Sequence, residues 1–168
     1  AYPVLAIAGP SPARLAAMDS LWVAYTLLYR GDPQGLAHVE ESLHIDPNLA
    51  LANIIRAEFA MKHQDWTTAL QYLRRGLELI GQPDQIFSPD DTISINANVI
   101  EANARVSLGY TLMALATQAS EEGDLEIAMR HLNVARLHLL ASLELEPTSA
   151  VKETAENLLS LLSEAYKR

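Results

Sequence analysis

The chain has 168 residues, 49% of them hydrophobic and 20% charged, with 12 basic and 21 acidic side chains and no cysteine. This length fits one domain with its own core. The formal net charge of −9 disfavours nucleic acid and anionic lipid surfaces as direct partners, and the lack of cysteine excludes disulfides and thiolate metal sites. The lack of cysteine does not indicate the cellular compartment, because such a chain suits both a reducing cytoplasm and an oxidising periplasm.

Helix-period patterns rich in Ala, Leu, Glu and Arg, separated by glycine and proline, predict an all-α protein. Ser11, Asn48, Ser88 and Thr148 are the expected N-caps of four of the helices, and Gly31 is expected to end the first. No apolar stretch approaches the roughly 18 residues that would span a bilayer, so no direct membrane insertion is expected. In chain order, the seven predicted helices cover residues 12–30, 34–45, 49–63, 66–80, 89–119, 124–146 and 149–167.

The sequence repeats itself. Residues 23–32 and 42–48 have a second copy in residues 56–66 and 76–79, and Ala24 and Ala57 are 33 residues apart. A third copy, over residues 108–147, is stretched: Gly109 and Gly123 are 14 residues apart, about seven more than between the equivalent positions of the tetratricopeptide repeat, which these copies resemble. About seven residues are two helical turns, so both arms of the third hairpin are predicted to be longer while keeping their inner face.

These segments resemble the tetratricopeptide repeat family, whose unit of 34 residues is a helix hairpin with small residues where its helices touch. Ala24, Ala57, Ala69 and Gly76 match those small positions. The resemblance implies a superhelical stack of three hairpins, the third elongated, and one C-terminal capping helix. The expected organisation is an extended segment over 1–10, two repeats over 11–80, a linker over 81–88, the elongated hairpin over 89–147 and the cap over 148–168.

The resemblance also implies a concave groove lined by the first helix of each hairpin. Tyrosine gives contact area with a polar end, which suits a groove for an apolar peptide, although ordinary packing between hairpins would use the same face. Leu21 and Tyr25 occupy places where some members have the Lys and Asn that bind a terminal carboxylate, so no such clamp is expected. The groove residues predicted to bind a partner are Tyr25, Tyr29, Glu58, Lys62 and Tyr110.

The remaining candidate features concern metal binding, catalysis and self-association. Glu40 and His44 share a helix face, but two ligands leave a tetrahedral metal site half built, so no metal and no cofactor is expected. No nucleophile elbow, phosphate loop or pair of carboxylates appears, which argues against catalysis. On the lengthened third hairpin, the apolar residues expected to reach beyond the shorter second hairpin and to support a homodimer are Leu112, Met113, Leu115, Ile127 and Met129.

The sequence therefore predicts a non-enzymatic protein-interaction module that binds a protein or peptide segment in its groove, or a second copy of itself. The alternative is a regulatory or ligand-sensing domain of a larger bacterial sensor or transcription regulator, because the stretch from Gly35 to Ala52 also resembles repeats found in bacterial membrane-associated or winged-helix transcription regulators. A closed pocket under Tyr25 and Tyr110 would favour the sensor, and an open groove would favour the interaction module.

Overall fold

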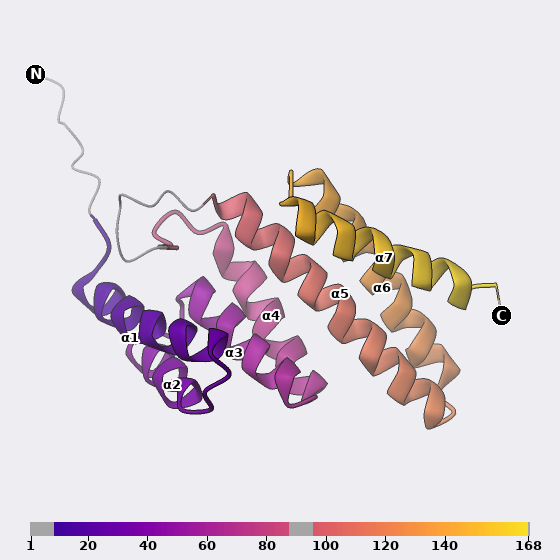
Figure 1. The fold of residues 1–168 in the computed structure, drawn as a ribbon, viewed down its shortest axis with the longest axis horizontal. Coiled ribbons are helices and arrows are strands. Elements are labelled where there is room, and N and C mark those ends of the chain that lie inside the picture. Colours follow the sequence, from indigo (N-terminus) through magenta and orange to yellow (C-terminus); the bar gives the residue numbers. More distant parts are fainter. Residues whose placement is uncertain (1–8, 88–95, 168) are drawn as a thin grey trace, which may run out of the picture.

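The computed structural model describes residues 9–87 and 96–167, and within them the chain is all-helical. Six helices pair as three hairpins, and the seventh packs against the last hairpin (Figure 1). The helices are α1 (Pro12–Tyr29), α2 (Gly35–Ile45), α3 (Ala50–Lys62), α4 (Trp66–Ile80), α5 (Ala97–Glu121), α6 (Leu125–Glu144) and α7 (Ser149–Ala165). The predicted class, a stack of three hairpins followed by one helix, is confirmed.

Successive hairpins pack against each other through both of their helices. Helix α1 contacts α3, α3 contacts α5 and α5 contacts α7, so the odd-numbered helices form one continuous row. Each second helix also contacts the first helix of the next unit, as α2 does with α3, α4 with α5 and α6 with α7. One face of the molecule is therefore built from the odd-numbered helices alone.

Small residues allow the helices to approach closely. Ala24, Ala57 and Ala69 are fully buried, as the repeat pattern predicts. At Gly76, a Cβ atom would lie 2.7 Å from Cγ1 of Ile54, closer than any packed side chain tolerates. Gly109 plays the same part in the third hairpin, where a Cβ would lie 2.7 Å from Cγ of Leu139.

The third hairpin is longer than the second. Helices α5 and α6 have 25 and 20 residues, whereas α3 and α4 have 13 and 15. Near the α5/α6 turn, the two helices are joined by a small cluster of Ala116, Ala119 and Ala128, against which Leu132 packs. Alanine fills little volume, so the larger apolar side chains of this end lie outside that contact.

Two of the four predicted N-caps are confirmed, one is wrong and one lies outside the described residues. Ser11 and Thr148 are N-caps as expected, and their hydroxyls accept the amides of Arg14 and Val151. The third helix was predicted to be capped by Asn48, but its N-cap is Leu49. The side-chain oxygen of Gln85 accepts a hydrogen bond from the backbone N–H of Ala50 at 2.7 Å. The predicted start of the fifth helix at Ser88 lies outside the described residues; α5 begins at Ala97 with Asn96 as its cap.

A buried arginine holds the N-terminal half together. Arg14 of α1 is 7% exposed, and its Nε lies 2.6 Å from Oδ2 of Asp46 at the end of α2. Its Nη1 donates to the Asp84 carbonyl at 2.9 Å and lies 2.7 Å from Oδ2 of Asp84. Residues 81–87 are the described part of the linker predicted over 81–88. This segment is therefore bound to α1 through Asp84 and to α3 through Gln85.

Candidate functional site

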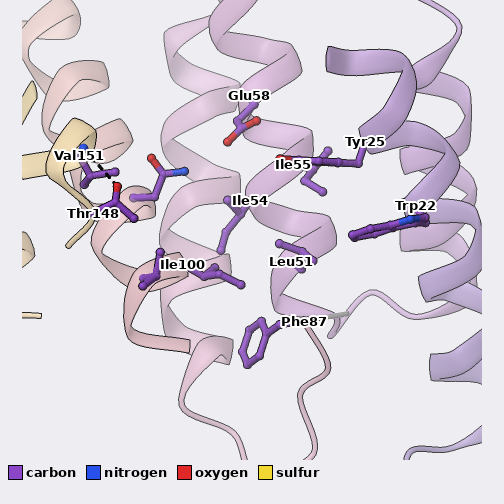
Figure 2. A pocket seen from close by; sticks show the side chains of 12 residues that line it. Trp22, Tyr25, Leu51, Ile54, Ile55, Glu58, Phe87, Ile100, Thr148 and Val151 are labelled. Carbon is purple, nitrogen blue, oxygen red and sulfur yellow. Dashed lines mark hydrogen bonds between the residues drawn. The ribbon is translucent and has the colours of Figure 1, made fainter. Parts of the chain in front are cut away.

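The row of odd-numbered helices carries a groove of about 340 Å³, named here the inner groove (Figure 2). Helices α1, α3, α5 and α7 and the segment before residue 88 all contribute to it, so each hairpin takes part. Its lining is mostly apolar. The lining residues are Trp22, Tyr25, Leu51, Ile54, Ile55, Glu58, Phe87, Val99, Ile100, Asn103, Thr148 and Val151.

Two stacked aromatic rings form the α1 wall of the inner groove. Trp22 and Tyr25 are three residues apart on one helix face, and their ring centroids lie 5.7 Å apart with an interplanar angle of 18°. Tyr25 is 44% exposed, so this wall is open to solvent. In Figure 2 the Tyr25 side chain points toward the face of α3 that carries Glu58. The wall thus offers a broad apolar surface with a hydroxyl at its end.

Glu58 brings an acidic group into this apolar setting. It follows Leu51 and Ile54 along one face of α3, and burial in the groove raises the pKa of its carboxyl above the ordinary value. The positive charge of Lys62 lowers the pKa in turn but does not offset the burial. The Lys62 ammonium itself donates to the Leu28 carbonyl of α1 at 3.0 Å.

A smaller hollow of about 250 Å³ adjoins the groove, and we call it the tyrosine hollow. Tyr25 and Glu58 line both spaces, so the two spaces lie side by side at these residues. Tyr29, which also lines the hollow, is 88% exposed. The residues lining the tyrosine hollow are Tyr25, Leu28, Tyr29, Glu58 and Lys62.

The structure brings four of the five predicted groove residues together. Tyr25, Tyr29, Glu58 and Lys62 surround the tyrosine hollow. Tyr110 lines neither space: it lies further along α5, where its ring meets that of Trp66 edge to face with centroids 5.7 Å apart. A closed pocket under both Tyr25 and Tyr110 would favour a ligand sensor, but neither the inner groove nor the tyrosine hollow, which Tyr25 lines, includes Tyr110.

Sequence reasoning missed several lining residues. Trp22 lies three positions before Tyr25, so the helical period places both on one face, and this spacing could have identified it. Phe87 gave no such signal, because its place at the groove depends on the contacts of Arg14 and Gln85 with distant residues. Leu21, on the same helix, is fully buried in the core, which agrees with ordinary packing between hairpins.

The residues predicted for self-association divide into two groups. Leu112 is 1% exposed and belongs to the core, and Met113 and Leu115 are half-buried. Ile127 and Met129 are 41% and 44% exposed on α6. Leu112 does not reach the surface, as the self-association prediction required, because its side of α5 packs against the neighbouring helices.

Leu125, which is 66% exposed, extends the apolar surface of α6 at this end of the hairpin. A hollow of about 710 Å³ lies beside it, lined by residues of α5, α6 and α7 that include Met113, Met129 and Leu161. We call Leu125, Ile127, Met129 and this hollow the distal surface. It is separate from the inner groove, with which it shares no lining residue.

Within residues 9–87 and 96–167, no group of three or more His, Cys, Asp or Glu side chains could hold a metal ion. None of the helices described is both long and apolar enough to cross a membrane.

The helix stack defines a class of protein, the tetratricopeptide-like helical repeat. Among solved structures, it is similar to the N-terminal domain of stress-induced protein-1 (STI-1) from C. elegans, with a TM-score of 0.50 and 10% sequence identity over 88% of this chain and 98% of that one. No protein-family model and no curated protein matches the sequence. The likeness to the tetratricopeptide family is thereby confirmed for the fold.

Proposed function

We propose that this chain is a non-enzymatic interaction module whose inner groove binds a segment of a partner protein. The observation that carries the proposal is the row of first helices, which turns one face of three hairpins into a single apolar groove. Such a surface suits a helical or extended segment, whose apolar side chains would be removed from water along the groove. The 44% exposure of Tyr25 favours an open binding surface over an enclosed ligand pocket.

A random peptide display library offers a direct test. Peptides selected on the native chain should lose binding to Asn103→Trp, because Asn103 is exposed on the α5 wall and a large ring there would fill the groove without entering the core. They should also lose affinity for Tyr25→Ala. Leu137→Ala, at a 66% exposed position of α6 outside the groove, is the matched control and should bind normally.

If every selected peptide binds the two groove variants as well as it binds the native chain, the proposal is wrong. Circular dichroism and the thermal midpoint of each variant establish that the fold is kept. A partner that binds the even-numbered helices would also leave the groove variants unaffected. In that case Leu137→Ala would be the variant with weaker binding.

Self-association through the distal surface is a second candidate, favoured by the exposure of Leu125, Ile127 and Met129 on one end of α6. A second copy would cover these side chains around a two-fold axis. Sedimentation at micromolar concentration should show a dimer for the native chain and a monomer for Ile127→Glu with Met129→Glu, while Leu137→Glu stays dimeric. A native chain that sediments only as a monomer would contradict the self-association.

A further inference from the structure

We infer that the inner groove selects a segment carrying one cationic group among apolar side chains, and that Glu58 receives the cation. The inference deepens the proposed function, on which it rests. Among the described residues that line the inner groove, Glu58 is the sole charged one, and the chain as a whole carries a net charge of −9. A ligand is therefore matched by apolar contact along most of the groove and by a positive charge at one point.

The position of Glu58 determines where the positive charge of a bound segment would lie. It lies at the junction of the inner groove and the tyrosine hollow, because it lines both. A lysine or arginine side chain of a bound segment would leave the apolar floor near Ile54 and enter the hollow beside Tyr25 and Tyr29. The faces of both rings attract a cation, and the carboxylate supplies the opposite charge.

Among the described residues, the only cationic one lining the tyrosine hollow is Lys62, four residues after Glu58 on the same helix, and its ammonium donates to the Leu28 carbonyl of α1. Among the described residues, no ion pair within 4.0 Å joins Lys62 or any other cation to Glu58. The opposite face of the hollow, on α1, presents the aromatic rings of Tyr25 and Tyr29 and the side chain of Leu28.

The electrostatic state of Glu58 agrees with this geometry. Burial raises the pKa of its carboxyl, so the ionised form lacks the solvation it would have in water. A cation brought by a ligand replaces part of that solvation, whereas an acidic ligand would add repulsion. Charge-assisted hydrogen bonds are about twice as strong as neutral ones, so the pairing is large enough to set preference among apolar segments.

Selection from the display library tests the inference through its composition. Peptides that depend on the groove, as judged by loss of binding to Asn103→Trp, should be enriched in Lys or Arg at one position. Selection on Glu58→Gln should give apolar peptides without that enrichment. Selection on Glu58→Lys should favour Asp or Glu at the same position, a reversal that a merely structural role of Glu58 would not produce.

One selected peptide, synthesised with its basic residue and again with norleucine in that place, gives the magnitude. Glu58→Gln should weaken the Kd of the basic peptide about ten-fold, as loss of one charge-assisted hydrogen bond does, and leave the norleucine peptide nearly unchanged. Groove-dependent peptides without basic enrichment would overturn the inference but leave the proposed function standing. Peptides that ignore the groove variants would overturn the proposed function itself.

Discussion

Replacing Arg14 tests how the α1 wall of the groove is held. Arg14→Ala leaves the carboxylate of Asp46, whose side chain is 12% exposed, without its ionic partner, and it frees the segment that carries Phe87. Breaking a buried pair by removing one partner costs about 3–5 kcal/mol. Asp84 is 67% exposed and adds little, so we expect about 3 kcal/mol of lost unfolding free energy and a thermal midpoint about 10 °C lower.

Calorimetry or circular dichroism on three variants separates this effect from simple charge removal. Arg130→Ala is the matched control, because the pair of Arg130 with Glu126 is 69% and 84% exposed and should be worth less than about 0.5 kcal/mol. Arg14→Met combined with Asp46→Asn removes both charges and keeps an oxygen for the Asn48 amide, so it should recover much of the stability. Equal, small losses for Arg14→Ala and Arg130→Ala would refute the reasoning.

Two more predictions concern packing and pH. Ala69→Leu or Ala57→Leu should lower the unfolding free energy by about 1–3 kcal/mol, because both sites are fully buried between helices, and an unchanged thermal midpoint in both variants would contradict the repeat alignment. Because burial raises the pKa of Glu58 in the folded chain, the folded state binds more protons than the unfolded state, and stability is lost as the pH rises through that pKa. Glu58→Gln should therefore exceed the native chain in thermal midpoint at about pH 7 and approach it at about pH 4, whereas a constant difference at both values would disprove the shift.

The sequence was sufficient for the fold because the repeat is encoded locally. Small residues at fixed spacing and capping side chains such as Ser11 and Thr148 act locally, so they can be found without knowing the tertiary structure. The extra length of α5 and α6 follows from the same counting. Helix ends were less certain, as at the third helix, where the cap comes from Gln85, 35 residues away.

The site was predicted in part. Tyr25 and Glu58 were included because the resemblance to the repeat family implies a groove lined by one face of each first helix. Tyr110 was grouped with the tyrosines of α1 because the helix face shows which way a side chain points. It does not show which residues of the neighbouring helices lie opposite, and the ring beside Tyr110 is that of Trp66. Arg14 gave no signal at all, since a lone arginine near a helix start is usually exposed and its burial depends on Asp46 and Asp84.

The central claim is that the face of odd-numbered helices binds a protein segment, and NMR titration of the isotope-labelled chain with one library-selected peptide tests it most directly. The account predicts that the largest amide shifts fall on α1, α3 and α5 around Tyr25, Glu58 and Asn103, together with the indole N–H of Trp22. Leu137, on α6, should keep its position in the spectrum. Shifts confined to α2, α4 and α6, with the Trp22 indole unmoved at saturation, would contradict the account.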